Sequence, residues 1–175
     1  MADKAENQTS SSKLNSFLEK KKKGLLGLLI ALIVCLAAYI VISAVNNNTK
    51  EKNLAEIEEI SYTLTHDSAS LDESELNARR IDAIDNLAVY ANKGGIVGAR
   101  ANYLCAELTY QQKKYEDAVT YYEATAKKAG KTYLAPVAYY NLGVCYEQLN
   151  KLEDAAENYK LAADSKSFAL VPHAK

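Results

Sequence analysis

The chain has 175 residues, of which 49% are hydrophobic and 25% charged, and its formal net charge is -1. This length and composition exclude a wholly disordered chain and allow one modest domain with an appendage. Residues 46–175 contain 15 basic and 19 acidic residues, so no basic face for nucleic acid is expected.

The N-terminal residues 1–23 are polar and end in four lysines, at positions 20 to 23. Residues 1–19 are rich in Ser and Asn, a composition that is typical of disorder. We therefore predict a disordered basic tail over residues 1–23.

An uncharged apolar stretch follows at residues 24–45, reading GLLGLLIALIVCLAAYIVISAV. As a helix it would be about 33 Å long, enough to cross a hydrocarbon core of about 30 Å. The four lysines before it predict that the N-terminus is cytoplasmic and that the rest of the chain lies across the membrane. A cleaved signal peptide is the alternative, but the stretch is long and VISAV is a poor cleavage site. A lipoprotein box at Cys35 is disfavoured, because Val34 stands where a small residue is needed.

The remainder predicts an all-α fold, because it contains only Pro136 and Pro172 and no long alternating apolar pattern. Residues 46–74 are expected to form a juxtamembrane helix, at 51–65, and a linker. Asp72 or Ser74 is expected to cap the next helix, which should end at Gly94 and Gly95. Two helix pairs follow, at 98–112 with 115–129 and at 136–149 with 152–165.

The last pair carries a repeated pattern: KLEDAAENYK at 151–160 echoes KYEDAVTYYE at 114–123. Its pattern residues are Tyr139, Leu142, Gly143, Tyr146, Ala155 and Tyr159. This string resembles the tetratricopeptide repeat, a helix-turn-helix unit of 34 residues with W-x-x-L-G-x-x-Y in the first helix and A-x-x-x-F in the second. Gly143 and Ala155 are small, so the two helices can approach closely there. A large residue at Gly143 is expected to break the unit.

An earlier unit is a degraded copy of the same pattern. It has Asn102, Cys105, Ala106 and Thr109 in its first helix and Tyr115, Ala118 and Tyr122 in its second. Ala83 and Leu87 suggest a degenerate half unit before it, and the Leu-Val-Pro string at 170–172 suggests a truncated unit after it. The resemblance predicts a repeat domain over residues 75–175, with units at about 98–131 and 136–169.

Repeats of this family stack into a curved surface whose concave side, lined by first helices, binds peptides of other proteins. Helical spacing places eight candidate partner-binding residues on that side: Arg100, Tyr103, Glu107, Tyr110, Val137, Tyr140, Val144 and Glu147. Each of these tyrosines has the alternative role of bridging neighbouring repeats. The Lys/Asn pattern that clamps a C-terminal carboxylate is missing, which disfavours chaperone tails as partners.

Catalysis, metals and cofactors have little support in the sequence. His66, Asp67 and Ser68 are consecutive, which does not create a catalytic relay, and they are interpreted as loop and cap residues. Gly94, Gly95 and Gly98 lack the Gly-Lys-Ser/Thr ending of a phosphate loop. The three cysteines show no metal-site spacing, and Cys105 and Cys145 are interpreted as small core residues. We expect no enzyme activity, no metal and no cofactor.

The layout of a basic tail, one membrane helix and degenerate repeats resembles the YfgM-like family of ancillary subunits of the SecYEG translocon. This resemblance implies a bacterial inner-membrane protein whose partners are translocon subunits, chaperones or secreted chains. A cell-envelope scaffold that organises wall or division proteins is the alternative, as is a receptor with its repeats in the cytosol. Self-association is a further possibility, since a terminal repeat without a polar cap exposes an apolar strip.

Overall fold

The structure is a computed structural model that describes residues 2–165, with side chains from residue 21 onward. The described residues form six α-helices, one short 3-10 helix and no strand, which confirms the predicted all-α fold. The α-helices are α1 (Ala2–Thr65), α2 (Glu73–Ala91), α3 (Gly95–Gln111), α4 (Tyr115–Ala129), α5 (Leu134–Gln148) and α6 (Leu152–Ala163). The chain divides into two compact units, Met1–Thr49 and Lys50–Lys175.

The first unit is the part of α1 up to Thr49, which contains the apolar stretch 24–45 without a break. Among the described residues, this is the one helix long and apolar enough to cross a membrane by length and composition, criteria that a signal sequence near an N-terminus also meets. The structure differs from the predicted disordered tail, because α1 begins at Ala2. Once an apolar helix has nucleated, each further residue extends it at little cost.

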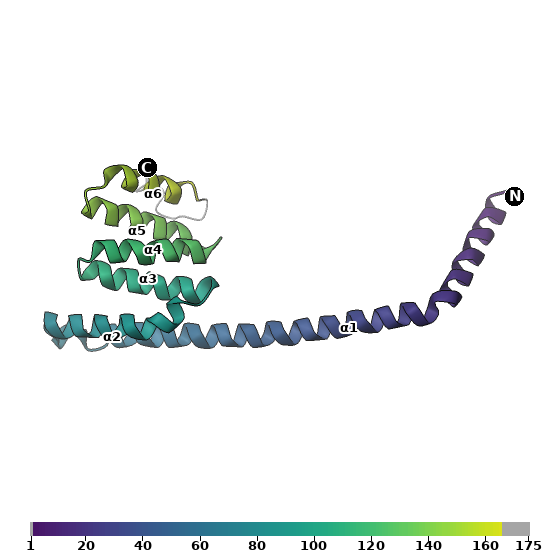
Figure 1. Cartoon of the computed structure of the whole chain (residues 1–175), viewed down its shortest axis with the longest axis horizontal. Helices are drawn as coiled ribbons and strands as arrows, with labels where there is room; N and C mark the ends of the chain where they lie inside the picture. Colours follow the sequence, from purple (N-terminus) through teal and green to yellow (C-terminus); the bar gives the residue numbers. More distant parts are fainter. Residues whose placement is uncertain (1, 166–175) are drawn as a thin grey trace. The chain divides into compact units, whose positions relative to one another are not determined.

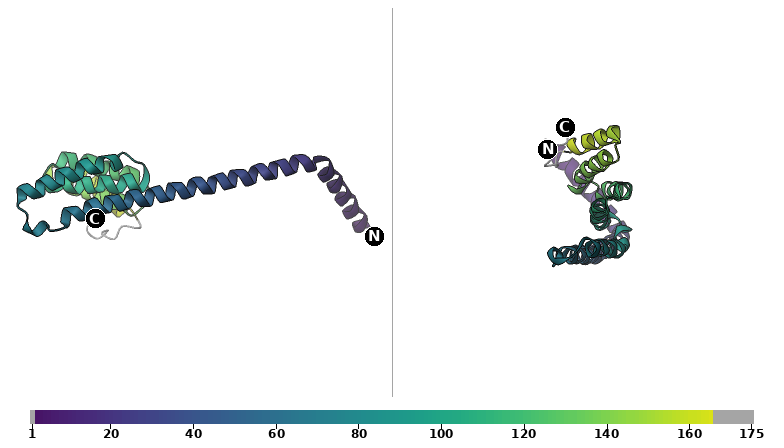
Figure 2. Two further views of the ribbon diagram at one scale, coloured as in Figure 1. Left: turned by 90° about the horizontal axis from the view of Figure 1, so that it is seen from below. Right: turned by 90° about the vertical axis from the view of Figure 1, so that its left-hand side faces the viewer.

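The second unit is a stack of antiparallel helices in which each neighbour in sequence is also a neighbour in space (Figure 1). Helix α3 packs along α4, α4 along α5 and α5 along α6, and α3 also touches α5. The view along the helices in Figure 2 shows the successive pairs offset from one another. This is the arrangement of tetratricopeptide-like repeats, in which first helices gather on one side of the stack.

The unit starts at Lys50, well before the predicted repeat boundary at residue 75. The last turns of α1 pack on α2 and α3 around Ile57, which is 2% exposed, together with Ala83 and Leu87. Residues 50–65 therefore act as the packing partner of α2.

Local signals place the helix boundaries. Asp72 is the N-cap of α2 and forms a capping box with Glu75, which confirms the predicted cap. The two later pairs turn through a left-handed residue, Lys113 or Asn150. In each turn a lysine N–H then donates to a first-helix carbonyl, at 3.0 Å for Lys114 and 2.8 Å for Lys151.

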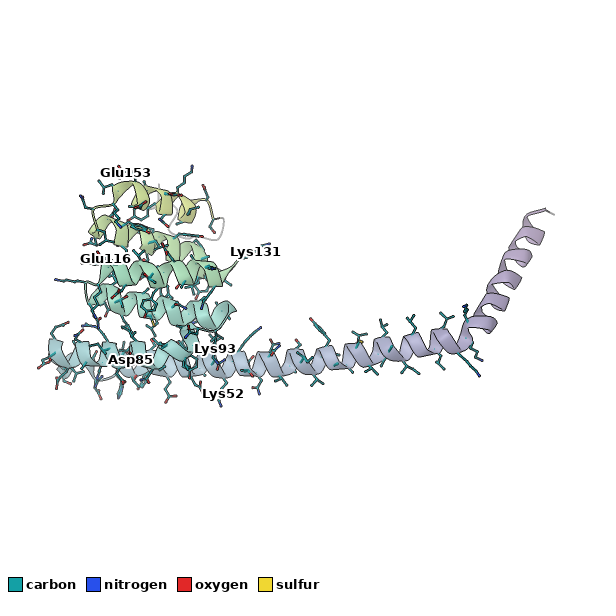
Figure 3. The ribbon with its side chains drawn as sticks, viewed as in Figure 1. Lys52, Asp85, Lys93, Glu116, Lys131 and Glu153 are labelled. Atoms are coloured by element: carbon teal, nitrogen blue, oxygen red, sulfur yellow. The ribbon has the colours of Figure 1, made fainter. Side chains whose placement is uncertain are left out.

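The first turns of α4 and α6 are both acidic, a favourable charge at a helix N-terminus. Figure 3 shows Glu116 and Glu153 at one edge of the stack and Lys131, in the turn after α4, at the opposite edge. The predicted truncated unit at 170–172 lies outside the described residues.

Candidate protein-binding groove

The nine residues predicted as structural repeat positions all lie in the packed interior of the second unit or at its margin. Tyr139, Tyr146 and Tyr159 are half-buried, and the other six are buried: Ala106, Ala118, Tyr122, Leu142, Gly143 and Ala155.

Helices α5 and α6 approach each other closely at Gly143. A Cβ atom added there would lie 2.5 Å from the ring of Tyr159, nearer than real Cβ contacts come. The small residue lets the Tyr159 ring of α6 lie directly on the backbone of α5.

The earlier repeat uses a polar residue where the repeat pattern has an aromatic one. Asn102 is 5% exposed, and its amide donates to the carbonyls of Ala91, at 2.8 Å, and Gly98, at 2.7 Å. Lys128 of α4 also donates to the carbonyl of Ala91, and to that of Lys93 at 3.1 Å. Carbonyl groups at the end of a helix have no N–H partner within that helix. At the end of α2, the Asn102 and Lys128 side chains supply the missing donors.

A pocket of about 200 Å³ opens where the last turns of α1 meet α3 and the start of α5. Its walls come mainly from the last turns of α1, from α3 and from α5, each the first helix of its pair. Its lining residues are Ile57, Glu58, Ser61, Arg100, Tyr103, Leu104, Glu107, Tyr133, Leu134 and Val137.

Two carboxylates and one guanidinium line this pocket. Arg100 forms an ion pair with Glu58 of α1, which binds the α1 segment to α3. Glu107 is half-buried, and burial raises the pKa of its carboxyl, although a hydrogen bond with Tyr103 partly offsets the rise. Burial, with the nearby Glu107 carboxylate, raises the pKa of Tyr103 to about 12, so its hydroxyl remains a donor at neutral pH.

The structure brings four of the eight predicted binding residues together in this pocket: Arg100, Tyr103, Glu107 and Val137. The other four are not among the residues that line it: Tyr110, Tyr140, Val144 and Glu147. Tyr110 packs edge-on against Tyr115, and Tyr140 lies 5.4 Å from Tyr159 between ring centroids. Each of these two tyrosines therefore contacts the second helix of its own repeat, which differs from the bridge between neighbouring repeats that the sequence left open.

Sequence reasoning missed six lining residues: Ile57, Glu58, Ser61, Leu104, Tyr133 and Leu134. The signal for Ile57 was present, because it belongs to the helical apolar pattern of residues 51–65. Interpreting that helix as the first helix of a degenerate repeat, instead of a juxtamembrane linker, would have placed it on the concave side.

A second hollow continues the pocket along the seam between α1 and α3. Both hollows are lined by Ser61, Leu104 and Glu107, and the second extends to Arg80 and Gln111. Arg80 is held there by Glu73, at 2.7 Å, and by the side chain of Gln111, at 3.2 Å. The two hollows form one groove, named here the α1–α3 groove, with Glu107 at its middle.

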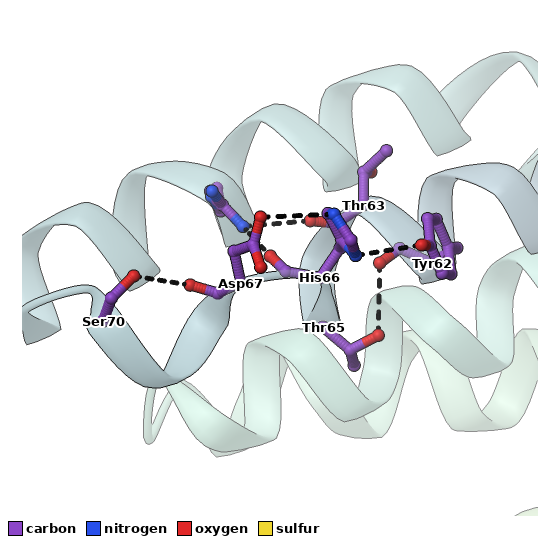
Figure 4. A network of polar contacts seen from close by, with 7 residues as sticks. Tyr62, Thr63, Thr65, His66, Asp67 and Ser70 are labelled. Atoms are coloured by element: carbon purple, nitrogen blue, oxygen red, sulfur yellow. Dashed lines mark hydrogen bonds and ion pairs between the residues drawn. The ribbon is translucent and has the colours of Figure 1, made fainter.

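The loop after α1 contains the His66–Asp67–Ser68 run, and Figure 4 shows its contacts. His66 Nε2 lies 3.2 Å from Asp67, and its Nδ1 lies 2.9 Å from the Tyr62 hydroxyl. The Ser70 hydroxyl donates to the carbonyl of Asp67 and not to His66. Arg79 of α2 donates to the carbonyls of Thr63 and His66, which fixes the loop. These are the contacts of a structural turn.

The cysteines of the second unit are buried and chemically inert. Cys105 and Cys145 are buried free thiols, and burial raises the pKa of each to about 12, which keeps them protonated. Within residues 21–165, no group of three or more His, Cys, Asp and Glu is placed to hold a metal ion.

Stacked helix pairs, a small residue at the helix crossing and a groove on the first-helix side define a tetratricopeptide-repeat-like protein. A curated relative from Treponema pallidum (strain Nichols), a "TPR repeat-containing protein", is 32% identical over 82 residues. The match covers 47% of this chain and 34% of the relative, so the chain spans about a third of that protein's length. No family model and no solved structure matches the chain.

Proposed function

We propose that this chain is a membrane-anchored scaffold for protein–protein interaction. Residues 24–45 would hold it in the bilayer, and the α1–α3 groove would bind segments of other proteins. The observation that carries this proposal is the groove itself, because three segments far apart in sequence place apolar and polar side chains around one hollow. The likeness to a curated repeat protein supports the same class of function.

We also propose that the chain acts at a bacterial inner membrane. The four lysines before the apolar stretch favour a cytoplasmic N-terminus and repeats on the far side of a bacterial inner membrane. At that position the groove would meet chaperones or chains emerging from the translocon. The scaffold would thus assist protein export.

Photocrosslinking in living bacteria tests the partner. A photoreactive residue replaces Tyr133, which lines the pocket and is 56% exposed. The same residue at Val89, which is 64% exposed on α2 and lines no described hollow, is the control. Capture of translocon subunits, chaperones or secretory chains from position 133 alone would support the export role. Capture of wall or division enzymes would favour the envelope-scaffold alternative, and equal capture from both positions would contradict the groove as the binding surface.

Topology is tested separately with Ser74→Cys and a membrane-impermeant maleimide. Ser74 is exposed, whereas the buried Cys105 and Cys145 thiols should give little background. With the outer membrane permeabilised, labelling of intact cells is the expected result. Protection until the inner membrane is lysed would overturn the proposed orientation.

A further inference from the structure

Glu107 is placed unusually for a charged residue on a repeat surface. Its carboxylate lines both hollows of the α1–α3 groove, and it is half-buried beside Leu104. The Tyr103 and Tyr133 rings line the same pocket, with the aliphatic side chains of Leu134 and Val137. A carboxylate among such groups has lost much of its hydration.

The cations of the groove are already engaged elsewhere. Arg100 pairs with Glu58, and Arg80 pairs with Glu73 and contacts Gln111. Among the described side chains, no lysine or arginine lies within ion-pair distance of Glu107. Since Glu58 and Arg100 balance each other, the pocket carries one uncompensated negative charge.

We propose that this pocket receives a lysine or arginine side chain of a partner protein, with the cationic head at Glu107 and the stem against Leu104 and Val137. The proposal rests on the protein-binding role proposed above and specifies the chemistry of the partner. The partner segment would carry apolar residues beside the cation, because aliphatic side chains border the pocket.

Size and charge favour this occupant over others. The pocket volume of about 200 Å³ equals that of about seven water molecules in the liquid, which suits one long side chain. A cation would find a carboxylate acceptor and two tyrosine rings, and long basic side chains bury their stems readily against such apolar surface. An acidic partner would meet Glu107 and Glu58 without a free cation to pair with, so it would be repelled.

The test measures binding of short fluorescent peptides to the full chain in detergent micelles. The peptides are identical except for a central lysine, arginine, glutamine or glutamate flanked by leucines. The expected result is tighter binding of the lysine and arginine peptides than of the glutamine peptide, by about tenfold. Glu107→Gln should abolish that preference, so that the lysine, arginine and glutamine peptides bind the variant with equal affinity.

Glu123→Gln is the matched control. Glu123 accepts a hydrogen bond from the Tyr146 hydroxyl at 3.3 Å, much as Glu107 bonds with Tyr103, but it lies on α4 outside the groove. Both substitutions remove one negative charge, and circular dichroism checks that both variants fold. The control should keep the full preference for basic peptides.

Three outcomes would overturn the cation site. They are equal binding of all four peptides by the wild-type chain, no binding of any of them, and equal weakening by Glu107→Gln and Glu123→Gln. If one of these occurs while crosslinking from position 133 still captures proteins, the cation site fails and the scaffold function stands. Failure of the crosslinking alone would remove the scaffold function instead.

Discussion

The two later repeats, α3–α4 and α5–α6, have turns of the same geometry but different side chains in their cores. Both turns use a left-handed residue followed by a lysine N–H that donates to a first-helix carbonyl, at Thr109 in one repeat and Tyr146 in the other. The side chains at matching positions differ: Leu142 and Gly143 stand where the earlier repeat has Cys105 and Ala106. Backbone geometry therefore defines the repeat, and side chains are free to take other roles within it.

The two repeats use their side chains in different ways. In the later one, aromatic rings fill the helix crossing, with Tyr159 on Gly143. In the earlier one, Asn102 and Lys128 hold the carbonyl end of the preceding helix. The earlier repeat therefore also stabilises the helix that precedes it.

Leu142→Ala tests the core of the later repeat and should cause the largest loss of stability. Leu142 is 2% exposed, and its truncation should lower the free energy of unfolding by about 3 kcal/mol, from lost burial and the cavity left behind. Cys105→Ala, at the matching position of the earlier repeat, removes less volume and should cost less. Chemical denaturation in mild detergent, followed by tyrosine fluorescence, measures both, and equal losses would contradict the difference between the two cores.

Asn102→Ala tests the cap of the earlier repeat. It leaves the buried carbonyls of Ala91 and Gly98 without the Asn102 amide, so the free energy of unfolding should fall by about 2 kcal/mol. Hydrogen exchange should also speed up at the end of α2. Asn141→Ala, which removes a half-buried 3.3 Å bond to the Tyr103 hydroxyl, is the control and should cost less. No change in α2 exchange would refute the capping role.

Gly143→Ala should lower the stability slightly, although a change from glycine to alanine within a helix usually raises it. Alanine within a helix is favoured over glycine by about 1 kcal/mol, but here its Cβ would press on the Tyr159 ring at 2.5 Å. Overpacking of this kind costs about 1–3 kcal/mol, so a net destabilisation of about 1 kcal/mol is expected. In a Tyr159→Leu background the same change should be stabilising, and a double-mutant cycle measures the coupling.

Glu107→Gln should have the smallest effect, a change in how stability depends on pH. Because burial raises the pKa of Glu107 in the folded chain, its contribution is most favourable below the ordinary pKa of a glutamate and is lost as pH rises through the folded value. The variant should match the wild type near pH 4 and become the more stable of the two towards pH 7. A stability difference that does not vary with pH would contradict a raised pKa of Glu107 in the folded chain.

The sequence predicted the repeat fold well, because its signals are local. Asp72 with Glu75 marks a helix start, and small residues at 143 and 155 mark a close crossing. The candidate groove was predicted only in part. Its α1 wall depends on a tertiary contact between Ile57 and α2, and the helical pattern of residues 51–65 does not reveal which helix it meets.

Two tyrosines show a further limit of prediction from helix spacing. Tyr110 and Tyr140 lie on first helices, yet each contacts an aromatic ring of a second helix. Spacing tells which face of a helix a residue shares, but a long ring can reach across that face to a neighbour. The same periodicity therefore could not separate groove residues from residues that pack on the second helix of their own repeat.

The cap formed by Asn102 and Lys128 also limits how the array can be rearranged. Repeat proteins are commonly treated as interchangeable modules that can be duplicated or deleted. Deleting α3 and α4 here would bring Tyr139 to the position of Asn102. A phenol has one O–H donor, whereas the Asn102 amide donates both to Ala91 at the end of α2 and to Gly98 of its own helix. The contact between α2 and α3 therefore depends on which repeat follows α2. A shortened array would need Tyr139→Asn to restore this contact.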